Sequence, residues 1–200
     1  YAHQEAIRHY TNALELLEET QPEKRLDILV KSTYASFHLA DFRKCEIFSR
    51  KAIELAENLG DVKRNAELHA LLGYIYWWGK NDRPGALKIL QEGLKIIEKL
   101  EGTVEEAAIC QHIGRIYAIT GEEQNAIQWS QRAINLAERA GANEVLAQAY
   151  QSLAISLPLE RKNEVLTYLE ESRRISLENK LEDPACRAHT NLGTEYSMLR

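Results

Sequence analysis

The residues able to do chemistry in this chain of 200 residues include six histidines and three cysteines among scattered carboxylates. His69, Cys110 and His189 occupy the same position in the sequence repeat described below, the one arrangement that resembles a metal site. Zinc, however, holds its ligands at about 2.0–2.3 Å, whereas equivalent side chains on stacked helices lie roughly a helix diameter or more apart. We therefore predict no metal and no other cofactor.

No catalytic motif is present: the sequence lacks HExxH, GxSxG, GxxxxGK[ST] and GxGxxG. The acidic stretches at 15–19 and 104–107 are typical of solvated helix faces and helix N-termini, where carboxylates are favoured. We predict that the chain is not an enzyme.

Two of the three tryptophans are adjacent, in the stretch LLGYIYWWGK at 71–80. Neighbours on a helix point about 100° apart, so Trp77 and Trp78 cannot both face the core. We expect Trp77 to pack beside Gly73 and Trp78 to point with Tyr74 away from the core.

Composition narrows the class of protein. The chain is 44% hydrophobic and 28% charged, as in foldable globular proteins, and no apolar run approaches the length of a membrane span. A formal charge of −5 argues against nucleic acid as the main partner. Cys45, Cys110 and Cys186 lie far apart without a CxxC pair, so we expect small buried side chains and a cytoplasmic location.

The elements that must position these residues are helices, because alternating strand patterns with hairpin turns are absent. Two short sequence patterns, each marked by a small residue, alternate along the chain, and each recurs about every 40 residues. The small residues of the first pattern are Gly73, Gly114, Ala154 and Gly193, and those of the second are Ala13, Ala52, Gly93, Ala133 and Ser172.

Helix ends agree with this period. Thr103 and Glu106 form a capping box, Pro84 suits the first turn of a helix, and Asp183-Pro184 reads as an N-cap followed by proline. Two helices joined by a short turn therefore make up each repeat.

The small-xx-Tyr and Ala-xxx-aromatic-xx-Ala-Leu patterns resemble the tetratricopeptide repeat (TPR) over essentially the whole chain, in a variety longer than the usual ~34 residues. The resemblance implies an all-α fold, a right-handed α–α superhelix (solenoid) of about ten antiparallel helices. We expect one array over 1–200, a fragment of a longer protein, with an unpaired second helix at 1–20, pairs at 23–59, 62–100, 103–140 and 143–179, and an unpaired first helix at 182–200.

The resemblance also implies a concave groove lined by the first helix of each pair. A helical wheel set on Gly73 and carried to the other pairs gives the predicted partner-binding residues: Lys31, Tyr34, His38, Glu67, Leu71, Tyr74, Trp78, Gln111, His112, Arg115, Gln148, Gln151, Arg187 and Asn191. Aromatic and arginine side chains of this kind suit a peptide with an apolar anchor and some acidic residues.

Several functions remain open at this point. The leading interpretation is a protein-binding scaffold or sensor of a larger intracellular signalling or regulatory protein, with a protein or peptide partner and neither nucleic acid nor membrane. The alternatives are a self-assembly element that forms homo-oligomers and a small-ligand sensor near Trp77 and Trp78. Tyr74 and Trp78 could instead pack against the next repeat or a neighbouring molecule.

Overall fold

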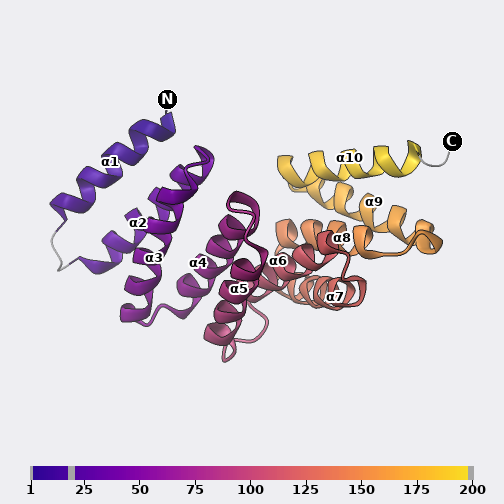
Figure 1. Cartoon of the computed structure of the whole chain (residues 1–200), viewed down its shortest axis with the longest axis horizontal. Coiled ribbons are helices and arrows are strands. Elements are labelled where there is room, and N and C mark those ends of the chain that lie inside the picture. Colours follow the sequence, from indigo (N-terminus) through magenta and orange to yellow (C-terminus); the bar gives the residue numbers. More distant parts are fainter. Residues whose placement is uncertain (1, 18–20, 198–200) are drawn as a thin grey trace. The chain divides into compact units, whose positions relative to one another are not determined.

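The computed structural model describes residues 2–17 and 21–197, and these residues form helices joined by short turns, without strands (Figure 1). The predicted all-α helical solenoid is therefore confirmed. The chain divides into two compact units, Tyr1–Lys99 and Leu100–Arg200. That residues 1–200 form a single array stays a prediction, and the predicted segment ends at 1, 18–20 and 198–200 lie outside the described residues.

Each unit consists of consecutive helices joined by short turns. The first unit contains α1 (Ala2–Leu16), α2 (Pro22–His38), α3 (Phe42–Leu59), α4 (Val62–Tyr74), the π-helical turn η1 (Ile75–Gly79) and α5 (Arg83–Ile97). The second contains α6 (Val104–Thr120), α7 (Glu123–Ala140), α8 (Asn143–Ser156), the 3₁₀ turn η2 (Leu159–Arg161), α9 (Lys162–Glu178) and α10 (Glu182–Ser197).

Side-chain caps and left-handed glycines set the helix ends. The Thr103 hydroxyl accepts a hydrogen bond from the Glu106 N–H at 3.2 Å, and the Glu106 carboxylate accepts one from the Gly102 N–H at 2.9 Å. Gly121 ends α6 with φ of +77°, a conformation that glycine adopts without steric cost. The Thr103 half of the predicted capping box is thus confirmed, whereas Glu106 accepts from the N–H of Gly102, one residue before the N-cap.

The predicted cap at Asp183 is wrong. Helix α10 begins at Glu182, and the Leu181 carbonyl accepts the hydrogen bond of the Ala185 N–H at 3.1 Å. Asp183 therefore lies in the first turn, where its negative charge interacts favourably with the positive end of the helix dipole.

Close helix contacts occur where the small residues of the first pattern lie. A Cβ on Gly73 would meet the Leu90 side chain of α5 at 2.6 Å, and one on Gly114 would meet the Ser130 nitrogen of α7 at 3.0 Å. Among the described residues, Gly193 of α10 has no such neighbour within 4 Å. Each unit buries its own apolar clusters, such as Leu26, Leu29, Ala52, Ala56 and Leu68 in the first and Ala154, Val165, Leu169 and Leu192 in the second.

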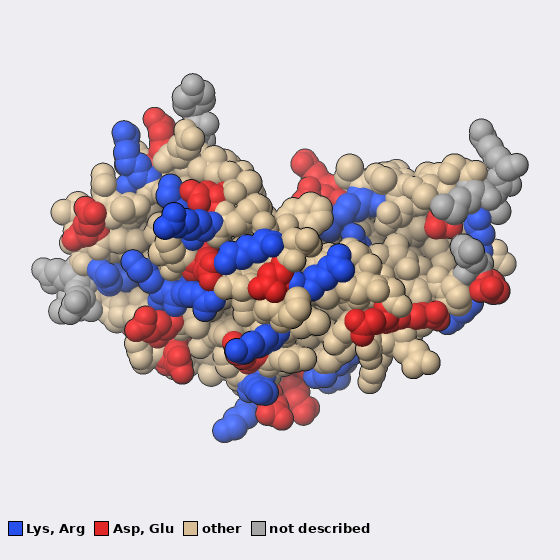
Figure 2. All heavy atoms as spheres, in the orientation of Figure 1, with Lys and Arg blue, Asp and Glu red and all other residues tan. Residues whose placement is uncertain are grey.

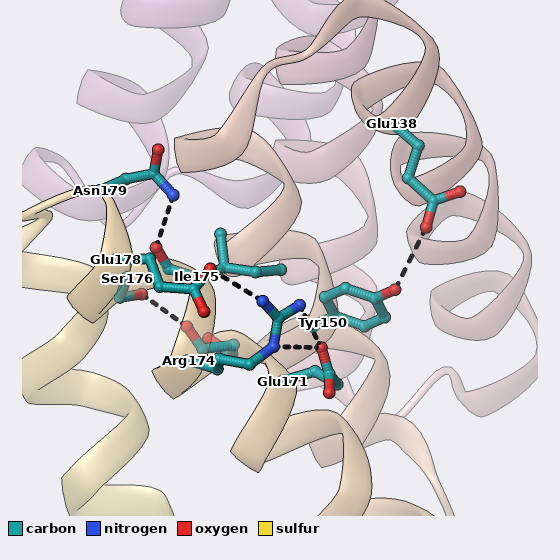
Figure 3. Close-up of polar contacts among 9 residues, drawn as sticks. Glu138, Tyr150, Glu171, Arg174, Ile175, Ser176, Glu178 and Asn179 are labelled. Atoms are coloured by element: carbon teal, nitrogen blue, oxygen red, sulfur yellow. Dashed lines mark hydrogen bonds and ion pairs between the residues drawn. The ribbon is translucent and has the colours of Figure 1, made fainter.

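Polar contacts on the second unit lie both between helices and within one helix. Figure 3 shows the Tyr150 hydroxyl of α8 donating to Glu138 of α7 at 3.3 Å. In the same view Arg174 of α9 donates to Glu171 and Glu178 at 2.7–3.1 Å. These exposed pairs each contribute little stability, so the repeat interfaces depend mainly on apolar packing.

The cysteines differ in exposure. Cys45 and Cys110 are fully buried, but Cys186 on α10 is exposed. The expectation of a buried side chain is wrong for Cys186, because its face of α10 is not covered by another described helix. In the parts of the chain that the structure describes, no helix is long and apolar enough to span a membrane.

Candidate partner-binding faces

In the first unit, α2 and α4 present several of the predicted residues. The Tyr34 hydroxyl of α2 donates to the Glu67 carboxylate of α4 at 3.0 Å, which joins two of these residues across neighbouring repeats. Tyr34 is 39% exposed, Lys31 is exposed and Leu71 is half-buried. This face is therefore open at α2 and holds a tyrosine in a fixed position.

An aromatic cluster follows along the same helices. The rings of Phe37 and Tyr74 lie 5.5 Å apart, and Tyr74 is half-buried. His38 is exposed and stacks on His3 of α1 with 4.9 Å between ring centroids. Phe37 and His3 were not among the predicted site residues. Tyr74 thus packs partly against the preceding repeat, whereas the alternative interpretation expected contact with the next repeat or a neighbouring molecule.

The two adjacent tryptophans separate at the π-helical turn η1. Trp77 is 8% exposed and lies under the Arg83 guanidinium, 5.4 Å from the ring centroid. Trp78 is 66% exposed. The predicted packing of Trp77 and outward direction of Trp78 agree with these exposures, whereas the π turn itself was not predicted.

Polar and close contacts hold this turn. Glu46 of α3 accepts hydrogen bonds from Tyr76 and Lys80 and pairs with Arg50 at 3.0 Å. Burial raises the pKa of Glu46, but the hydrogen bonds from Lys80, Tyr76 and Arg50 outweigh it and lower this pKa to about 2. A Cβ on Gly79 would meet the Phe42 ring at 2.5 Å. Trp78 is therefore presented by a well-packed turn.

In the second unit, α6 and α10 place two arginines around one histidine. Burial and the charges of Arg187 and Arg115 lower the pKa of His112 to about 4, so its ring is neutral at pH 7. Arg115, Arg187 and Asn191 are half-buried. The positive charge of this face therefore comes from the arginines.

Two predicted residues of the second unit are not on its surface. Gln151 is fully buried, and its Nε2 donates to the Ser172 Oγ and to the Pro184 carbonyl, both at 2.8 Å. Gln111 is 4% exposed. The prediction that these side chains are accessible is wrong, because both point between helices.

Other side chains of the second unit are accessible. Gln148 is half-buried and donates to Glu144 at 3.2 Å. Ile119 and Ile155 are 43% and 39% exposed, and both were missed as site candidates. They occupy the repeat positions of Trp78 and Tyr74, so the repeat register contained the signal for finding them.

On the face that Figure 2 shows, basic and acidic side chains are interspersed over each unit. Neither unit presents a broad field of one sign in this view. The charge on these faces is therefore local and comes from a few side chains.

Comparison with solved structures finds the same fold in other proteins. BtubC (BKLC) from P. vanneervenii is 19% identical, with a TM-score of 0.75 over 98% of this chain and 84% of that chain. A signal transduction ATPase with numerous domains (STAND) with a tetratricopeptide repeat sensor, from Pyrococcus horikoshii, is 22% identical, with a TM-score of 0.72 over 97% of this chain and 30% of that chain.

No protein-family model matches the sequence, and no curated protein matches it significantly. Identities below 25% show a shared fold alone. The chain is thus a helical repeat similar in fold to a protein that carries a tetratricopeptide repeat sensor.

Proposed function

We propose that this chain is a non-enzymatic protein-interaction module that binds a peptide or a segment of a partner protein on the first-helix faces of its repeats. The observation that carries the proposal is Trp78, which is 66% exposed on a turn held by packed neighbours. Tryptophan is one of the residue types most enriched among the few interface residues that contribute most of the binding free energy.

The partner's chemistry follows from the two faces. Trp78 and Tyr34 in the first unit suit an apolar or aromatic anchor. In the second unit Arg115 and Arg187 suit carboxylates, with exposed Ile155 available for apolar contact. The preferred ligand is a peptide with an apolar anchor and acidic residues.

A sensor or scaffold role in a larger cytoplasmic signalling or regulatory protein is the second part of the proposal. It is supported by the fold shared with the STAND protein, of which the matching region makes up 30%. Helical repeats offer long surfaces that suit recognition of another polypeptide.

The test is selection of peptides from a random library on the immobilised chain, followed by calorimetric titration of the selected peptides. Trp78→Ala should weaken binding about tenfold or more without lowering the melting temperature, because the side chain is exposed. Leu177→Ala is the matched control, since Leu177 is 57% exposed on α9 and lies outside the proposed faces.

Equal affinity of the Trp78→Ala and control variants would contradict the proposal. Light scattering over a range of concentrations separates it from self-assembly, because a binding module stays monomeric where an assembly element grows. Retained binding by Trp78→Ala together with concentration-dependent mass would favour the self-assembly alternative.

A further inference from the structure

A groove lies over α4 in the first unit, bounded by α3 and α5, on residues that the proposed partner-binding faces do not use. It consists of two adjoining hollows of about 280 and 250 Å³ that share Ile53, Glu57 and His69. We call this feature the α3–α5 groove. Its walls also include the apolar side chains of Ile89 and Ile96.

Two polar side chains at the base of the groove are nearly completely buried. Asn65 is 5% exposed and lines the larger hollow, and its Oδ1 has no hydrogen-bond partner among the described residues. Leaving a buried polar atom unpaired is costly, so an unpaired acceptor on a residue that lines a hollow indicates a place for a donor.

His69 supplies a second acceptor at the same base. It is 7% exposed, and its Nδ1 lies 2.9 Å from the Asn65 carbonyl oxygen. A carbonyl oxygen can only accept, so Nδ1 carries a hydrogen, and in this tautomer Nε2 is an acceptor. Nε2 has no hydrogen bond to the described part of the chain. Asn65 Oδ1 and His69 Nε2 can therefore each accept a hydrogen bond from a donor in the groove.

Carboxylates surround the opening. Glu54, Glu57 and Glu92 line the groove, and none of them forms an ion pair with another described residue. The one arginine in the lining, Arg50, is already bonded to Glu46 and to the Tyr76 hydroxyl. The groove therefore combines net negative charge at the opening, apolar walls and acceptors at the base.

We propose that the α3–α5 groove binds a lysine or arginine side chain of a partner polypeptide. The aliphatic stem packs against Ile53, Ile89 and Ile96, and the cationic group donates to Asn65 Oδ1 and His69 Nε2. The three unpaired glutamates compensate its charge. Lysine and arginine have apolar stems and only donors at their tips, which is the complement of this lining.

The test uses the whole ¹⁵N-labelled chain and three peptides, Ac-Ala-Lys-Ala-NH₂, Ac-Ala-Arg-Ala-NH₂ and the neutral analogue with norleucine at the centre. The lysine and arginine peptides should give saturable, millimolar NMR shifts of the Asn65 side-chain amide and the His69 ring nitrogens, because short ligands bind weakly. The norleucine peptide should give none.

Two variants check the chemistry of the lining. The double substitution Glu57→Gln and Glu92→Gln should lower the affinity for the lysine peptide about threefold to tenfold. The control Glu98→Gln with Glu101→Gln changes the net charge equally outside the groove and should leave affinity unchanged.

Asn65→Leu separates binding from structure. Removing the unpaired Oδ1 should leave the protein at least as stable to urea while weakening the lysine peptide at least tenfold. Equal binding of the norleucine peptide, or full lysine affinity in Asn65→Leu, would overturn the proposal. Trp78→Ala should not change these shifts, so failure here and failure of the proposed function are distinguishable.

Discussion

At the scale of single residues, the three histidines on α2, α4 and α6 have different surroundings. His38 stacks on His3, His69 donates from Nδ1 to a backbone carbonyl, and His112 lies near Arg115 and Arg187. The surroundings of these rings therefore come from their own helix at His69, from another helix at His38, and from both at His112.

Glu46 should stabilise the fold only while it is ionised. Its pKa is lowered from 4.5 to about 2, so its contribution is complete above about pH 4.5 and is lost as pH falls toward 2. Glu46→Gln should cost about 1–2 kcal/mol at pH 7. Urea unfolding of both proteins from pH 7 to 3 measures this difference, which should shrink below pH 4.5.

The matched control is Glu164→Gln, which removes an exposed carboxylate that pairs with Arg161 three residues earlier. This substitution should leave the unfolding midpoint at pH 7 unchanged, because solvent screens exposed pairs. A pH-independent difference between Glu46→Gln and the wild type would show that the carboxylate charge does not matter.

Gln151 should act in stability and not in partner binding. Its amide joins α8 to Ser172 of α9 and to the Pro184 carbonyl in the first turn of α10. Gln151→Ala should lower the free energy of unfolding by about 1–3 kcal/mol, because it removes two hydrogen bonds from a fully buried position. Urea titration measures the loss, and Gln148→Ala, at a half-buried position, should change stability by less than about 0.5 kcal/mol.

At the scale of helices, the same repeat position has different packing in different repeats. Gly114 lies against the backbone of Ser130, and Gly73 lies against the Leu90 side chain. No described atom lies within 4 Å of a Cβ placed on Gly193. A backbone cannot move aside as a side chain can, so the cost of an added methyl group should follow this order.

We therefore expect three outcomes from glycine-to-alanine substitution. Gly114→Ala should lower the free energy of unfolding by about 2–3 kcal/mol and Gly73→Ala by about 1–2 kcal/mol. Gly193→Ala should raise it by about 0.5–1 kcal/mol, because alanine favours a helix over glycine. Thermal and urea unfolding check the order, and three equal effects would contradict it.

The sequence predicted the helices well and the site only in part. Period, caps and prolines are local signals, and they were sufficient to predict an all-α repeat. The π turn at Ile75–Gly79 has no such signal, since it depends on Phe42 against Gly79 and on Glu46 beneath Tyr76. The burial of Gln151 depends on Pro184, 33 residues away, which a helical wheel cannot include.

At the scale of the whole molecule, the chain comprises two units that each bury their own apolar clusters. In repeat proteins each element contacts mainly its neighbours, so destabilisation is expected to stay local. This makes it possible to weaken one unit and follow the other.

Leu90→Ala should reduce hydrogen-exchange protection mainly in residues 1–99, because it removes a fully buried side chain of the first unit at a cost of about 2–5 kcal/mol. Ile113→Ala, which truncates a 1% exposed side chain of the second unit, should give the reverse pattern. Mass spectrometry of exchanged peptides measures both. Uniform loss over all peptides would indicate a single cooperative unit.

The exposure of Cys186 makes this chain convenient for site-specific labelling. Burial raises the pKa of Cys45 and of Cys110 to about 12, so both remain protonated and poorly reactive near pH 7.5. A maleimide dye should therefore attach once per chain, at Cys186 on α10, and peptide mapping should find it there. The natural sequence already provides a fluorescent reporter position in the second unit, without any engineered cysteine.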